Sequence, residues 1–135
     1  MTSEYSDLPF RSTTNAARKE LAARFALRFA EDMQDWEWEV ADAKRFDEFI
    51  GVYRSAGLND DERFSLMEML IQCIEDMELQ SNYVAAWSNI EPLLLSRPDL
   101  HRSTVAYWAC LHEVESLARF RVSEKMRQLW HVISE

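Results

Sequence analysis

The chain has very few residues that break regular backbone structure: two glycines and three prolines among 135 residues. An all-β domain needs a turn after nearly every strand, and glycine and proline supply many of those turns. Alanine, leucine, methionine, glutamate and arginine are frequent instead, and these residues favour helix. The scarcity of turn residues therefore predicts an all-α fold.

Apolar residues recur at helical spacing along most of the chain, in segments separated by short polar stretches. A length of 135 residues is typical of one domain, and it allows a shared core without metal or disulfide support. We predict a single-domain bundle of five to six helices over residues 14–135, after a flexible N-terminal arm at residues 1–13. The predicted helices cover residues 15–33, 42–55, 60–77, 82–96, 103–118 and a last segment that begins near residue 123.

Local signals mark several of the predicted helix ends. Gly57 supplies the left-handed position after the second helix. Asn59 and Glu62 have the spacing of a capping box, so they predict the start of the third helix. Pro92 is expected to kink or interrupt the fourth helix, and Ser123 is expected to cap the last one.

The net charge of −9 is unevenly distributed along the chain. Residues 31–91 contain sixteen acidic and four basic side chains, whereas the flanking segments are slightly basic. Such an acidic segment repels phosphate, which argues against direct nucleic-acid binding. It would attract a basic protein partner or imitate nucleic acid.

The sequence carries no sign of a membrane or an oxidising compartment. Its first ten residues, "MTSEYSDLPF", lack the basic and apolar regions of a signal peptide. No apolar run approaches the roughly 18 residues of a membrane span. Cys73 and Cys110 lie within apolar helical patterns, so we expect packed, reduced thiols in a cytoplasmic protein.

One short stretch, "HEVES", resembles half of a zinc-protease helix. That motif needs two histidines four residues apart, but Ser116 follows His112 at this spacing, and serine is a poor zinc ligand. Phosphate-cradling loops, nucleophile elbows and di-iron E-x-x-H motifs are also missing from the sequence. We therefore predict a protein that is not an enzyme and that has no catalytic residues, no metal site and no cofactor.

Acidic residues gather in three clusters, at residues 31–42, 60–62 and 75–78. The first contains the stretch "DWEWE", in which two tryptophans alternate with acids. Aromatic residues anchor protein interfaces, and charges at the rim steer the partner. Two alternatives remain open: the acids only solvate helices, or Trp36 and Trp38 close the end of the bundle. The candidate partner-binding residues are Asp35, Trp36, Glu37, Trp38, Glu39, Asp60 and Asp61.

Four stretches share a pattern of apolar and aromatic positions: "ERFSLMEMLIQCIED", "LLLSRPDLH" preceded by Trp87, "TVAYWAC" and "FRVSEKMRQLW". Together they resemble small bacterial proteins of the polymorphic-toxin immunity type. The resemblance covers roughly residues 61–130 and implies a cytoplasmic inhibitor that binds a cognate toxin. It assigns no functional residue, because the matched positions look like core, and "DWEWE" lies outside it.

The sequence therefore supports two candidate functions. The first is a non-enzymatic binding protein that captures a basic partner, such as a toxin domain, and neutralises or regulates it. The second is a structural or adaptor protein that assembles with itself as a homodimer.

Overall fold

The computed structural model describes residues 10–111 and 119–134, which form seven α-helices, one 3-10 helix and no strand. The all-α prediction is confirmed within these residues, with one helix more than the five to six expected. The additional helix is the single-turn α2. The elements are α1 (Asn15–Phe25), α2 (Trp36–Glu39), η1 (Ala43–Arg45), α3 (Phe46–Arg54), α4 (Asp60–Glu75), α5 (Gln80–Ser96), α6 (Pro98–Ala109) and α7 (Ser123–Ile133).

The described chain divides into two compact units, and the boundary between them falls inside α5. Among the described residues, one unit is formed by residues 12–87, and the other by residues 88–111 and 119–134 together with residues 10 and 11. The single domain expected over residues 14–135 stays a prediction. Of the expected N-terminal arm, residues 1–9 lie outside the described part. None of the described helices is both long enough and apolar enough to cross a membrane.

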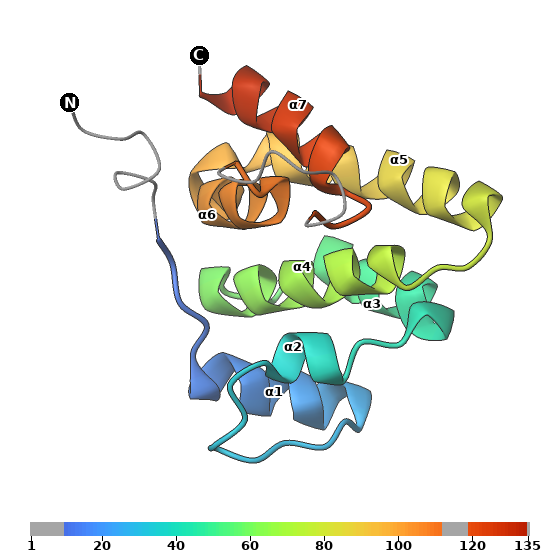
Figure 1. Cartoon of the computed structure of the whole chain (residues 1–135). Helices are drawn as coiled ribbons and strands as arrows, with labels where there is room; N and C mark the ends of the chain where they lie inside the picture. Colours follow the sequence, from blue (N-terminus) through green and yellow to red (C-terminus); the bar gives the residue numbers. More distant parts are fainter. Residues whose placement is uncertain (1–9, 112–118, 135) are drawn as a thin grey trace. The chain divides into compact units, whose positions relative to one another are not determined.

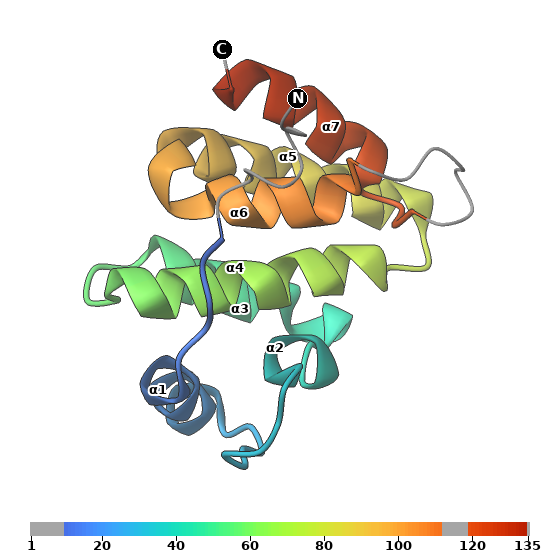
Figure 2. The same ribbon diagram turned by 60° about the vertical axis from the view of Figure 1, so that its left-hand side comes forward.

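In the unit of residues 12–87, α4 is the central element and packs against α1, α2 and α3 (Figures 1 and 2). The predicted capping box is confirmed: Asn59 Oδ1 accepts from Glu62 N at 2.8 Å, and Asn59 N donates to Glu62 Oε1 at 3.0 Å. Every residue from Phe64 to Ile71 is buried, so α4 has no exposed face along this stretch. A helix enclosed on all sides forms the core of its unit.

The first helix is shorter than predicted. It ends at Phe25, because Ala26 adopts a left-handed conformation with φ 57° and ψ 47°. Leu27 N then donates to Ala22 O at 2.9 Å, which closes the helix end in the manner of a Schellman motif. The predicted continuation to Met33 is therefore wrong, and residues 26–35 form a loop that leads to α2.

In the other unit, α6 packs closely against α7. The fourth predicted helix, α5, continues through Pro92 without the expected interruption. The fifth begins at Pro98, five residues earlier than predicted, with proline in its first turn. It ends at Ala109 because Cys110 is left-handed, with φ 49°.

Ser123 does not cap α7 as predicted. It is the first helical residue, is buried, and its Oγ donates to Trp108 O at 2.7 Å. The same oxygen accepts from Phe120 N at 3.0 Å. Ser123 thus links the start of α7 to α6 instead of satisfying its own helix.

Candidate partner-binding surface

The stretch "DWEWE" forms α2, but half of it lies inside the protein. Trp36 is 0% exposed and Glu37 is 3% exposed. A partner cannot touch side chains enclosed to this degree. Trp36 and Glu37 are therefore corrected from partner-contacting residues to residues that hold α2 in place.

Glu37 is held by a buried cation on the neighbouring helix α1. Arg18 Nη2 donates to Glu37 Oε1 at 2.7 Å, and Arg18 Nε donates to Glu37 Oε2 at 2.9 Å. Ser65 Oγ of α4 donates to Glu37 Oε2 at 2.6 Å. The Arg18 guanidinium also donates to the carbonyl oxygens of Met33 and Gln34 at 2.7 and 2.8 Å. One two-pronged ion pair thus joins α1, α2, α4 and the loop before α2.

Trp36 is buried in the same region and contacts two residues of the loop before α2. Its Nε1 donates to Arg28 O at 2.6 Å, and Phe29 meets its ring edge-on with centroids 6.3 Å apart. A buried indole usually needs a partner for its N–H, and this carbonyl provides one. For Trp36, packing within the helical core is therefore a better interpretation than contact with a partner.

The other candidate residues remain at the surface. Asp35, Glu39 and Asp60 are exposed, whereas Trp38 and Asp61 are half-buried. Trp38 Nε1 donates to Glu68 Oε1 of α4 at 3.2 Å, which fixes the indole against that helix. These five side chains are the accessible part of the predicted partner-binding set.

Two of the three acidic clusters lie on elements that touch each other. The Glu37–Ser65 and Trp38–Glu68 hydrogen bonds attach α2 to the first half of α4. Asp61 precedes Ser65 by four residues, so it lies one turn away on the same side of α4. The third cluster, at residues 75–78, follows the opposite end of α4, about 22 Å further along the helix axis at 1.5 Å per residue. The structure therefore groups the first two clusters and separates the third.

Several arginines of this unit bind backbone carbonyls at the ends of its helices. Arg45 Nη2 donates to Phe25 O at the end of α1 at 2.9 Å, and its guanidinium lies 5.1 Å from the Phe49 ring centroid. Arg63 donates to Tyr53 O and Ser55 O at the end of α3. Cations at helix C-termini are favourable, because the helix dipole is negative there.

The net charge of residues 12–87 is strongly negative, and two of its arginines are paired with glutamates. The unit has sixteen acidic and eight basic side chains. Arg18 is buried against Glu37, and Arg45 is tied to Glu48 by a bidentate pair at 2.8 Å. The hydrogen bond and charge of Arg45 hold the pKa of Glu48 below its ordinary value.

Three residues that position α2 are not among those predicted from the sequence: Arg18, Ser65 and Glu68. A signal for Arg18 was present: it lies four residues before Ala22 and seven before Phe25, on the apolar stripe of its helix. A charge on such a stripe indicates a buried partner of opposite sign. The sequence does not show that this partner is Glu37, nineteen residues away.

The described residues contain no group of three or more His, Cys, Asp and Glu side chains that could hold a metal ion. The "HEVES" segment, with His112 and Ser116, lies outside the described residues. Cys73 and Cys110 are both free and buried. Burial raises the pKa of the Cys73 thiol to about 12, so this residue has almost no nucleophilic thiolate at neutral pH.

Comparisons with protein-family models, curated proteins and solved structures give no match to this chain. The function is therefore inferred from the residues and their arrangement.

Proposed function

We propose that the protein binds a basic partner protein through the acidic surface of α2 and the first turn of α4, and thereby neutralises or regulates it. The observation that carries this proposal is the arrangement of charge around α2. Arg18 is buried and holds α2 in place, while Asp35 and Glu39 remain exposed, with Arg28 Nη2 4.0 Å from Glu39 Oε1. Asp60 and Asp61 lie in the first turn of α4, and Asp61 lies one turn before Ser65, which donates to Glu37 of α2.

Electrostatic capture is the expected first step of this interaction. A clustered negative surface attracts a cationic partner over a distance set by the Debye length, about 8 Å at physiological ionic strength. Contacts between rim charges mainly raise the association rate and discriminate against wrong partners. Trp38, half-buried and fixed by Glu68, is the aromatic residue placed to make the apolar contact.

The partner to test first is a bacterial toxin domain, because the apolar pattern over residues 61–130 resembles immunity proteins of polymorphic toxins. The proposed setting is the cytoplasm. The free, buried state of Cys73 and Cys110 is compatible with that reducing compartment.

A capture experiment with two charge variants tests the surface. The protein is immobilised and exposed to lysate of its native cell, beside two variants that each lose four negative charges. The site variant carries Asp35→Asn, Glu39→Gln, Asp60→Asn and Asp61→Asn. The control variant carries Asp47→Asn, Asp76→Asn, Glu78→Gln and Glu124→Gln.

We expect one basic protein to be held by the wild type and the control, released by added salt, and lost from the site variant. The association rate of the purified pair should fall steeply as salt increases. Equal retention by all three baits would place the interface elsewhere. If both variants lose the captured protein equally, binding depends on the net charge of the chain and not on the four residues of the site variant. Circular dichroism checks that both variants keep their helices.

The toxin assignment has a separate test. The captured protein is expressed in a test bacterium with and without this chain. Growth arrest that is relieved by the wild type and not by the site variant supports inhibition of a toxin. A captured protein that does not slow growth points to another class of basic partner.

A further inference from the structure

Arg28, in the loop before α2, is held differently from two other arginines of its unit. Arg18 and Arg45 each bind a glutamate through two hydrogen bonds of 2.7–2.9 Å. The Arg28 side chain is 62% exposed, and its Nη2 lies 4.0 Å from Glu39 Oε1 and 3.5 Å from Glu39 O. Exposed ion pairs contribute little free energy, so this cation lies on the candidate surface without being fixed there.

The main chain of Arg28, in contrast, is firmly attached to α2. Arg28 O accepts the N–H of the buried Trp36 indole at 2.6 Å, and the next residue, Phe29, packs edge-on against the same ring. A charged group tethered close to its counterpart has a high effective concentration, so it competes for that counterpart even when each contact is weak. The loop thus carries a loosely bound guanidinium whose backbone is anchored beside α2.

Glu39 offers a cation two acceptors, a side-chain carboxylate and a main-chain carbonyl. It is the last residue of α2, so no later turn of this helix donates to its carbonyl oxygen. The Glu39 side chain is 47% exposed, which leaves the carboxylate accessible to a partner. A guanidinium carries five N–H donors in a planar fork and can bind both oxygens, whereas an ammonium is a compact charge. The two acceptors therefore favour arginine over lysine.

We propose that Arg28 masks Glu39 in the free protein, and that an arginine of the basic partner replaces it on binding. The guanidinium of the partner binds the carboxylate and the carbonyl of Glu39, while the Arg28 side chain turns to solvent. This inference rests on the proposed function and adds to it the group that is recognised and a competitor within the chain itself.

The mask lowers the apparent affinity of the surface without blocking it. A partner binds the fraction of molecules in which Glu39 is open, so its apparent affinity falls by that fraction. For an exposed pair the reduction is at most about fivefold. An isolated cation competes poorly with the tethered Arg28, whereas a partner with several positive charges also gains attraction from Asp35, Asp60 and Asp61. The mask thus discriminates against weakly basic proteins.

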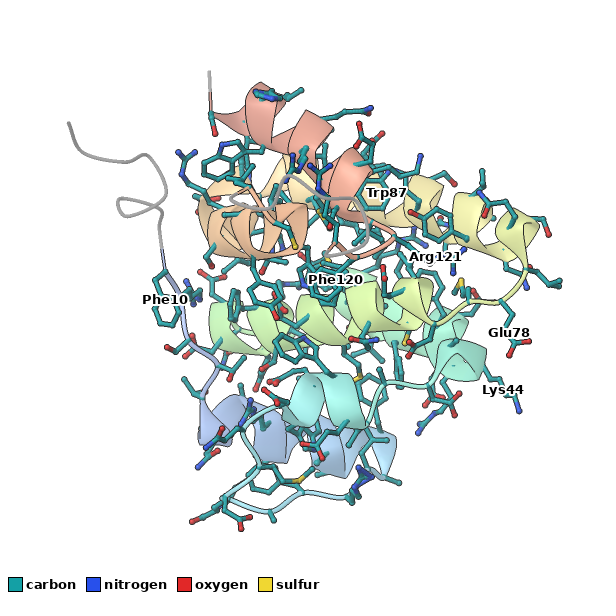
Figure 3. All side chains as sticks on the ribbon, viewed as in Figure 1. Phe10, Lys44, Glu78, Trp87, Phe120 and Arg121 are labelled. Carbon is teal, nitrogen blue, oxygen red and sulfur yellow. The ribbon has the colours of Figure 1, made fainter. Side chains whose placement is uncertain are left out.

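A fluorescently labelled peptide of alternating glycine and arginine serves as the probe of this exchange. Its dissociation constant is measured by fluorescence anisotropy at low salt, with the wild type and two variants that each lose one positive charge. Arg28→Gln removes the mask. Lys44→Gln is the matched control, because Lys44 is an exposed residue of η1 whose side chain projects away from the ribbon (Figure 3).

We expect Arg28→Gln to bind the peptide about threefold more tightly than Lys44→Gln does. In a Glu39→Gln background the two variants should bind equally, because the carboxylate that Arg28 masks is gone. A peptide of glycine and lysine should gain less affinity from Arg28→Gln than the arginine peptide gains. Equal binding by Arg28→Gln and Lys44→Gln would overturn the mask, and an equal gain for the two peptides would overturn the assignment of arginine.

The four-residue site variant separates this inference from the proposed function. It should bind the arginine peptide more weakly than the wild type does. If it binds more weakly while Arg28→Gln and Lys44→Gln bind equally, the acidic surface stands and the mask is overturned. If it binds as tightly as the wild type, both proposals are overturned. Arg28 and Lys44 are exposed, so circular dichroism should show the same helix content and melting temperature for both single variants.

Discussion

At the residue scale, the Arg18–Glu37 pair is the contact on which the position of α2 depends most. Both side chains are more than nine-tenths buried, and each makes further hydrogen bonds. Removing one partner of a buried pair leaves the other charge without compensation, which typically costs about 3–5 kcal/mol. Glu37→Gln should therefore lower the free energy of unfolding by an amount in this range, as measured by urea denaturation.

The matched control is Glu31→Gln. Glu31 also pairs with a cation of α1, Lys19 at 3.0 Å, but the two side chains are 69% and 58% exposed. Exposed pairs contribute about 0–1 kcal/mol, so this variant should unfold at nearly the wild-type urea concentration. Similar losses in both variants would contradict the special role of the buried pair.

A second prediction concerns the reactivity of Cys73. Desolvation by burial raises the pKa of its thiol to about 12, so the thiolate is scarce at pH 8. In a Cys110→Ser background, Cys73 should react with a thiol reagent at least a hundredfold more slowly in the native protein than in denaturant. Rapid native reaction would show that the core around α4 opens more often than its packing implies.

At the scale of elements, the sequence predicts a helix end well where two residues mark it together, as Asn59 and Glu62 do in the capping box of α4, whereas the single residue Ser123 does not cap α7. The helix α4 begins at the predicted Asn59 cap. The helix α3 ends at Arg54 with Ser55 in an extended conformation, so Gly57, with φ 110°, lies two residues beyond the C-cap and does not form the predicted helix end. The ends of α1 and α6 were missed, and both are followed by a left-handed residue that is not glycine, Ala26 and Cys110. Non-glycine residues rarely adopt this conformation, so the residue types at these two positions do not predict a helix end.

Ala26→Gly is predicted to stabilise the protein. Ala26 is exposed, so the change removes no buried contact, while glycine adopts φ 57° without the steric cost of a Cβ atom. We expect a gain of about 1 kcal/mol in the free energy of unfolding. Ala23→Gly, at an exposed position inside α1, should instead lose about 1 kcal/mol. If both changes lower the free energy of unfolding, Ala26 at the end of α1 is not held in the left-handed conformation.

Part of the candidate surface could be predicted from the sequence. The acidic character of residues 31–42 and 60–62 is visible in the sequence, and Asp35, Glu39 and Asp60 do lie at the surface. The burial of Trp36 and Glu37 was not predictable from a single-turn helix, which has too few residues to show a period. Their burial depends on Arg18, a contact between segments that are distant in the sequence.

At the scale of the whole molecule, the charge is concentrated in one of the two compact units. Residues 12–87 carry a net charge of −8, whereas residues 88–135 contain equal numbers of acidic and basic side chains. Repulsion within a strongly charged unit opposes folding. A surface that costs stability in this way is consistent with selection for binding, because functional surfaces often retain unfavourable groups.

This repulsion predicts that salt stabilises the protein. Raising NaCl from 10 to 150 mM shortens the Debye length from about 30 to about 8 Å and screens the exposed acids, while buried pairs such as Arg18–Glu37 are screened much less. The melting temperature at pH 7 should rise by about 4 °C, which corresponds to roughly 1 kcal/mol for a domain of this size. The four-residue site variant should show a smaller rise, because it has already lost part of the repulsion around α2. A melting temperature that falls with salt would mean that surface ion pairs such as Lys19–Glu31 outweigh the repulsion, and would weaken the case that the acidic surface is kept for a partner.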